Sequence, residues 1–244
     1  MLLRCIRAEN RKLRRSPIWL LFLAVPAISA VYGTFNYKMN LEILTHGWYD
    51  LWTQYTLFYA IFFFAPLIGV YAAYLWRLEH RGHNWNLIMT APLRPFCLYF
   101  AKFCVVTKMA VLTQVWLLLL FVIGGKFGAG LTGSLPPEIV LWLIRGVIGG
   151  LAIIALQLLL SMVIRNFALP VLIALGGSVA GLLAVGKDAG LYWPYSLMIM
   201  GMNSNRTEDV MAGGVWGFFL SCAVFLAVFL LIANILLTKR DVEA

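Results

Sequence analysis

Six long apolar runs, separated by short polar stretches, dominate the pattern of hydrophobic positions along the chain. Each run is close to the roughly 20 residues that a helix needs to cross the apolar part of a bilayer. The six predicted spans are residues 17–34, 53–76, 98–124, 139–164, 167–186 and 215–237. Because a span must satisfy its own backbone hydrogen bonds, the pattern predicts an all-α polytopic membrane protein with six transmembrane helices in a single domain, 1–244.

Two stretches outside the spans are also expected to be helical. Residues 1–16 carry a weak apolar stripe beside several arginines, which is typical of an amphipathic helix that lies on the membrane surface. A basic flank that only fixes the topology fits the same residues. Residues 187–214 combine clustered aromatic residues with the short apolar run 197–202. We interpret this segment as an outer helical hairpin between helices five and six, either re-entrant or interfacial.

The distribution of charge supports the membrane assignment and predicts an orientation. The chain is 62% hydrophobic and 12% charged, which is too apolar for a soluble protein of 244 residues. The net charge of +9 could indicate nucleic-acid binding, but the basic residues stand at the ends of the apolar runs, as topology signals do. We therefore expect no nucleic-acid partner, and both termini in the cytoplasm. The cations expected outside are Lys38, Lys126, Lys187 and Arg206.

The longest polar stretch on the predicted cytoplasmic side joins spans two and three, from Trp76 to Lys102. It has a charged start, an amphipathic piece at 85–89 and a turn with two prolines. Glu79 is predicted to pair with a neighbouring basic residue and to fix the angle at which the loop leaves the membrane. Lys102 and Lys108 lie near the inner end of span three, where long side chains can extend to the interface.

Catalytic and metal chemistry is not expected. The sequence has no phosphate loop of the Gly-x-x-x-x-Gly-Lys-Ser/Thr type, which excludes ATP hydrolysis by that route. No carboxylate lies in the middle of a span, which disfavours a transporter coupled to protons or sodium. Glu79, His80 and His83 are close in sequence, but the histidines are three positions apart and no second cluster accompanies them. We predict no catalytic residue, no metal ligand and no cofactor in this chain.

Five polar or aromatic residues in or near the membrane are candidates for a substrate path: Arg145, Gln157, Tyr192, Trp193 and Tyr195. Arg145 lies about two turns inside span four. There it either extends outward or faces a protein interface or a substrate. Gln157 fits an interhelical hydrogen bond better than a substrate contact.

The order of these features resembles that of the type-2 ABC exporter permeases. The residues that carry the resemblance are Glu79, the stretch 83–86 (His-Asn-Trp-Asn), the stretch 90–92 (Thr-Ala-Pro) and the stretch 99–103 (Tyr-Phe-Ala-Lys-Phe). Within that family the chain is similar to the permeases of lantibiotic-immunity and bacitracin-resistance exporters. The architecture corresponds over nearly the whole chain, and the motif over a small part of it.

The resemblance implies that residues 79–90 form a coupling helix that docks on a separate ATPase subunit. The residues assigned to this coupling contact are Glu79, His83, Trp85, Leu87, Ile88, Pro92 and Arg94. Judged by the residues alone, the apolar members of this set could instead anchor the loop in the inner leaflet.

The resemblance further implies two ABC ATPase subunits, which bind ATP and Mg, and a second permease, identical or related. The substrate class would be a lantibiotic-like antimicrobial peptide expelled from a bacterial cytoplasmic membrane, which gives immunity or antibiotic resistance. Because the chain has no large external domain, no individual substrate contact is carried over from the family. The alternatives are an ABC exporter of a lipid or another hydrophobic compound, a membrane scaffold or sensor subunit without transport, and an intramembrane enzyme.

Overall fold

The computed structural model describes residues 1–80, 94–211 and 213–239. Within these ranges every regular element is a helix, which confirms the all-α prediction. In chain order the elements are α1 (Leu2–Leu13), α2 (Ile18–Met39), α3 (Trp48–Phe58), the π-helical turn η1 (Tyr59–Phe63), α4 (Phe64–His80), α6 (Pro95–Ile123), the π-helical turn η2 (Gly124–Gly128), α7 (Pro137–Val163), α8 (Ala168–Gly186), the 3-10 turn η3 (Gly190–Tyr192), α9 (Pro194–Gly201) and α10 (Gly214–Lys239).

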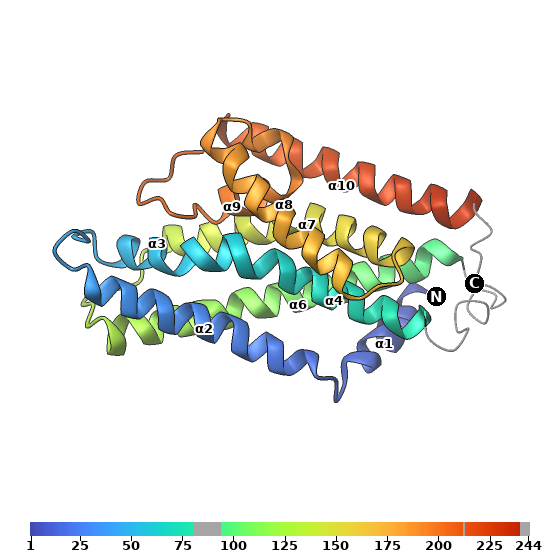
Figure 1. Ribbon diagram of the computed structural model, residues 1–244, viewed down its shortest axis with the longest axis horizontal. Helices are drawn as coiled ribbons and strands as arrows, with labels where there is room; N and C mark the ends of the chain where they lie inside the picture. Colours follow the sequence, from blue (N-terminus) through green and yellow to red (C-terminus); the bar gives the residue numbers. More distant parts are fainter. Residues whose placement is uncertain (81–93, 212, 240–244) are drawn as a thin grey trace.

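Six helical segments of the described chain are long and apolar enough to cross a membrane, which confirms the predicted number of spans. The second of them consists of α3, η1 and α4 in direct succession. Figure 1 shows the long helices roughly along the long axis of the molecule, with α1 at the end of the bundle where α4 ends and α6 begins. The turn between α2 and α3 lies at the opposite end.

The connection between the first two spans is shorter than expected. The sequence predicted a polar loop over 35–52, but α2 continues to Met39 and α3 begins at Trp48. The amide of Asn36 donates a hydrogen bond to Gln54 Oε1 at 2.5 Å and so joins the two helices. Because these polar side chains find partners on a neighbouring helix, the helices extend beyond the ends of the apolar runs.

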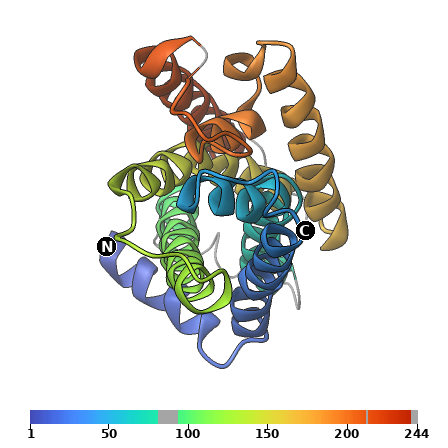
Figure 2. The ribbon, with the colours of Figure 1, turned by 90° about the vertical axis from the view of Figure 1, so that its left-hand side faces the viewer.

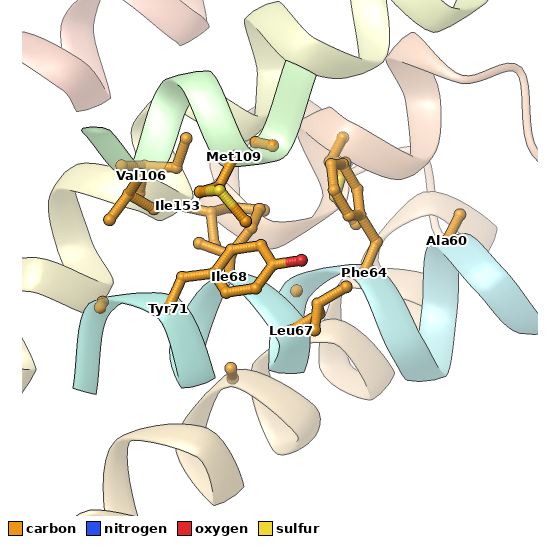
Figure 3. Packing of buried hydrophobic residues seen from close by; sticks show 14 of the residues in the cluster. Ala60, Phe64, Leu67, Ile68, Tyr71, Val106, Met109 and Ile153 are labelled. Carbon is orange, nitrogen blue, oxygen red and sulfur yellow. The ribbon is translucent and has the colours of Figure 1, made fainter. Parts of the chain in front are cut away.

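The core lies where α4, α6 and α7 meet. In Figure 3, Ile68 and Tyr71 of α4 face Val106 and Met109 of α6, and Ile153 of α7 lies beside them. All five side chains are buried. Close packing of large side chains from three helices fixes the positions of these helices relative to one another. It therefore holds the end of α4 next to the start of α6.

The spans differ in how much of their surface is covered. The α3–η1–α4 segment and α7 are more than half buried, whereas α2, α8 and α10 leave most of their apolar surface exposed. An apolar helix can expose its side chains in this way when its surroundings are lipid or another apolar surface. The segments α4 and α7 are thus the centre of the bundle, and α10 is peripheral.

The segment between α8 and α10 forms one short helix packed deeply into the bundle. α9 lies against α7 and α8 and also contacts α10, and Figure 2 shows it between α8 and α10. A β-carbon at Gly149 of α7 would lie 2.5 Å from Leu197 O, and one at Gly201 of α9 would lie 2.5 Å from Arg145 O. Such backbone contacts require glycine. In place of a hairpin of two full helices, the structure has the eight-residue α9 followed by turns and irregular chain.

Candidate functional site

Four charged side chains join α1 to the end of α4 and the start of α6. Lys102 Nζ lies 2.8 Å from Glu9 Oε2 and 2.7 Å from Glu79 Oε1. Lys12 Nζ bonds to the same Glu79 oxygen and lies 2.5 Å from Glu9 Oε1. The two cations and two carboxylates therefore form a closed ring of ion pairs, which we call the charge cluster (Glu9, Lys12, Glu79 and Lys102).

The charge cluster is almost completely shielded from the exterior. Lys102 is 0% exposed, Glu9 is 1% exposed and Glu79 is 3% exposed, so only Lys12 reaches the surface. Lys102 also donates to Leu75 O at 3.1 Å, and its ammonium lies 5.0 Å from the centre of the Trp76 ring. Buried charges are tolerated when each is paired and hydrogen-bonded, and the charges of this cluster sum to zero.

The local sequence explains how these side chains meet. The buried residues of α1 are Cys5, Glu9 and Leu13, and positions four apart share one face of a helix. Lys12 follows Glu9 by three positions and lies beside it. Pro95 occupies the first turn of α6, where its missing N–H costs no helical hydrogen bond, so the sequence defines where this helix begins.

The cluster keeps Lys12 protonated. Burial lowers the pKa of the Lys12 ammonium, but attraction to Glu9 and hydrogen bonds to Glu79 and Glu9 raise it by more, so the pKa lies above its ordinary value. A lysine with a raised pKa contributes stability at neutral pH. This contribution is lost only as the pH rises through the raised pKa.

Further contacts hold the last turn of α4 against its other neighbours. His80 Nε2 lies 3.0 Å from Ser161 O of α7. The Arg77 guanidinium lies 5.5 Å from the centre of the Phe167 ring, next to the start of α8. Together with the charge cluster, these contacts join the end of α4 to α1, α6 and α7. This joined end immediately precedes residues 81–93, where the coupling contact was predicted.

The structure describes two of the residues assigned to coupling. Glu79 belongs to the charge cluster, and Arg94 is exposed at the position before α6. The remaining five lie outside the described residues: His83, Trp85, Leu87, Ile88 and Pro92.

Sequence reasoning did not identify most of the charge cluster. The expectation that Lys102 extends to the interface is wrong, because two carboxylates draw its ammonium inward. Lys108 bonds to Asn10 on α1. Glu9 is the single acid among the cations of residues 1–16, and its spacing to Lys12 suggests a pair. Its contact with Lys102, 93 positions away, leaves no local signal in the sequence.

A second ion pair lies toward the other end of α7. Arg145 Nη1 is 2.8 Å and 2.9 Å from the two carboxylate oxygens of Asp209, in the segment between α9 and α10. Arg145 is buried, and the side chain of Asp209 is 35% exposed. Arg145 thus contacts protein, and the pair holds the irregular segment 202–211 against α7.

Three of the candidate path residues lie together beside α9. Gln157 Nε2 donates to Tyr195 OH at 2.7 Å, which is an interhelical hydrogen bond. Trp193 Nε1 donates to Gly177 O of α8 at 2.8 Å, and the rings of Trp193 and Tyr195 are 6.3 Å apart. Tyr192 differs from these three residues because it is 81% exposed.

A pocket of about 180 Å³ opens beside α9 near the same end of the bundle. Its walls come from the end of α8, from η3 and α9, and from the segment that follows α9. The polar residues of the lining are Asp188, Tyr192, Asn203, Ser204 and Arg206, and the others are apolar or glycine. Within residues 1–80, 94–211 and 213–239, no group of three His, Cys, Asp or Glu side chains is placed to hold a metal ion.

Most of the chain matches a family of known proteins. Residues 5–181, about three quarters of the chain, match the model of a family described as ABC-2 family transporter protein. The matched range begins within α1 and ends within α8, so it contains the whole charge cluster and ends before α9. A search of the curated proteins and a search of the solved structures found no match.

Proposed function

Because this chain belongs to the ABC-2 family of transporter proteins, we propose that it is the membrane-spanning permease subunit of an ATP-driven exporter. The chain is a multi-pass membrane protein, and membership of the family implies an ABC ATPase partner. In this proposal two ATPase subunits bind ATP and Mg, and a second permease, identical or related, pairs with this chain. The membrane is the bacterial cytoplasmic membrane, and both termini are cytoplasmic.

The charge cluster is the observation that carries the coupling part of the proposal. An ATPase that moves as a rigid body can transmit its movement to membrane helices only through a rigid element. Glu79 lies in the last turn of α4 and Lys102 lies near the start of α6, on either side of residues 81–93. Lys102 pairs with Glu9 and Glu79 pairs with Lys12, so both helices are joined to α1. A force applied to residues 81–93 would then displace α1, α4 and α6 together.

Helix α7 is the proposed route from this end to the outer segment. Tyr99 of α6 donates to Ala155 O of α7 at 2.6 Å, close to the core. Farther along α7, Arg145 pairs with Asp209, and Gly149 lies against the backbone of α9. A displacement of α6 would reach α9 through these contacts with α7.

We further propose that the substrate is a lantibiotic-like antimicrobial peptide, so that export gives immunity or antibiotic resistance. The resemblance of residues 79–103 to the permeases of such exporters supports this substrate class. Gln157, Trp193 and Tyr195 are the proposed path residues that lie together beside α9, and Arg145 and Tyr192 are the other two. Gln157 Oε1 is buried and has no hydrogen-bond partner among the described residues, so it could accept a bond from a peptide N–H.

The test is purification of the full-length chain from its native membrane, followed by mass spectrometry and an ATPase assay in proteoliposomes. We expect an ABC ATPase in stoichiometric amount, and ATP hydrolysis that rises when a lantibiotic is added. Absence of any ATPase would contradict the exporter and favour a scaffold or an enzyme. Stimulation by a phospholipid but not by the peptide would replace the proposed substrate with a lipid.

A further inference from the structure

The exposed side of α1 is a row of arginines. The face of α1 toward α6 is buried, whereas the opposite face and the turn after it carry Arg4, Arg7, Arg11, Arg14 and Arg15, all of them exposed. None of the five makes an ion pair with a described residue. We call these five side chains the arginine face. The two acids of the same region, Glu9 and Glu79, are already neutralised within the charge cluster.

Large apolar side chains stand beside the arginine face. Leu3 is 71% exposed on α1 itself, and Leu20 is 70% exposed at the start of α2. The indole of Trp19 donates to Leu13 O at 2.9 Å, which places an aromatic ring between α1 and the span that follows. Exposed apolar residues, a tryptophan and clustered cations at the end of a span are typical of the boundary between lipid tails and head groups.

We propose that the arginine face binds the phosphate groups of anionic phospholipids in the leaflet at the α1 end of the bundle. A guanidinium group can donate two hydrogen bonds to the oxygens of one phosphate. The five arginines also supply a positive surface that anionic lipid would neutralise. The face is continuous with α2, the first membrane span, because only residues 14–17 separate the two helices. This continuity and the apolar neighbours favour a lipid surface over an acidic protein surface.

Lipid bound to the arginine face would help to hold the charge cluster together. Arg7 and Arg11 lie on either side of Glu9 along α1, and Glu9 turns to the opposite face to meet Lys102. The head groups would press α1 against the bundle from outside, while the ion pairs hold it from inside. The proposal concerns lipid alone and stands whether or not the chain exports a peptide.

The test compares lipid affinities of the full-length chain in detergent by native mass spectrometry. Phosphatidylglycerol and phosphatidylcholine of identical chain length are the two probes. We expect tighter binding of phosphatidylglycerol by the wild-type chain. The triple variant Arg4→Gln, Arg7→Gln and Arg11→Gln should lose about fivefold in phosphatidylglycerol affinity per arginine, or roughly a hundredfold in all.

Two matched variants separate charge from folding and from position. Replacing the same three arginines by lysine keeps the charge and should retain the preference for phosphatidylglycerol. Replacing Lys38, Lys126 and Lys187 by glutamine removes three cations from the last turn of α2, from η2 and from the C-terminal end of α8. This leaves the arginine face intact and should leave the affinity unchanged. Equal affinity of the wild-type chain and the arginine-to-glutamine variant would overturn the proposal. So would loss of a protein partner by that variant with unchanged lipid binding.

Discussion

Lys102 is the residue that links α1, α4 and α6 at the α1 end of the molecule. Its ammonium is fully buried and is the common partner of two carboxylates on two other helices. A buried ion pair adds little net stability compared with an apolar contact. Loss of one member is strongly destabilising, however, because the other charge is left buried without a partner. Lys102 therefore matters less for the strength of its own contacts than for what its removal would leave unpaired.

We predict that Lys102→Met lowers the free energy of unfolding by about 3–5 kcal/mol, since Glu9 and Glu79 would share only Lys12, whose side chain is 27% exposed. Thermal unfolding of the full-length chain in detergent measures the loss. Lys38→Met is the matched control, because Lys38 is an exposed lysine near the end of α2, and it should change the stability little.

A second substitution shows whether the unpaired charge causes this loss. Adding Glu79→Gln to Lys102→Met removes one of the stranded carboxylates, so the double variant should be more stable than Lys102→Met alone. If the two losses simply add, Lys102 and Glu79 are not coupled in the way that their 2.7 Å contact implies.

The pair formed by Arg145 and Asp209 is expected to control the order of the segment after α9. Asp209→Asn should speed hydrogen exchange over residues 203–211, by an amount corresponding to about 1 kcal/mol for a partly exposed pair. Arg145→Gln should give a similar change, and the double variant should add nothing further. Glu208→Gln is the control, because it removes the neighbouring acid and leaves the pair intact. Equal exchange in Asp209→Asn and Glu208→Gln would contradict this role.

At the scale of elements, two helices behave in ways that hydropathy alone does not determine. α1 is an amphipathic helix whose inward face is partly charged, and it is joined to α6 through Glu9 and to α4 through Lys12. α9 is short and apolar, and it enters the bundle because glycines on α7 and α8 leave room for its backbone. Both helices depend on partners that are distant in sequence.

The limits of the sequence-based predictions follow from the same distinction. The number of spans could be predicted, because each span carries its own apolar run. The extension of α2 to Met39 could not, because it depends on the contact between Asn36 and Gln54. Glu79 could be singled out as polar at the end of a span, whereas its partners Lys102 and Lys12 come from separate helices.

We predict that Gly149→Ala disrupts the packing of α9 against α7. The added methyl group would lie 2.5 Å from Leu197 O and 2.6 Å from its carbonyl carbon. These are backbone atoms, which cannot relieve the clash by changing a side-chain rotamer. A loss of about 1–3 kcal/mol in thermal unfolding is expected from such overpacking. Gly176→Ala on α8 is the same change in open space and should be neutral or stabilising by up to about 1 kcal/mol. Equal stability of the two variants would show that α9 does not need the space at Gly149.

At the scale of the whole molecule, the buried α4 and α7 connect two ends with different properties. One end carries the charge cluster and adjoins residues 81–93, and the other carries α9, the pair of Arg145 with Asp209, and the pocket. α7 contacts both, through Ser161 at the first end and Arg145 at the second. In the proposed exporter, α1 would be part of the moving unit although it precedes the coupling segment by more than 60 residues.

The sharpest test of this view separates coupling from folding. The double variant Glu9→Gln and Lys12→Gln removes the charges that α1 supplies, yet keeps Glu79 and Lys102 as a neutral pair, so the bundle should remain folded. We expect the ATPase to co-purify as before, while substrate-stimulated hydrolysis and transport fall about tenfold, equivalent to ~1.4 kcal/mol of lost coupling. Glu138→Gln, which removes an acid bonded to Tyr49 at the other end, should leave both unchanged.

Variants of the predicted coupling helix complete the comparison. Trp85→Ala should weaken the binding of the ATPase itself, because Trp85 is assigned to the docking contact, and Glu79→Ala should lower transport and stimulated hydrolysis while the chain still inserts. The double variant of α1 should differ from Trp85→Ala by keeping the ATPase bound. If it retains full transport, α1 is only an anchor, and the movement passes from residues 81–93 into α4 and α6 alone.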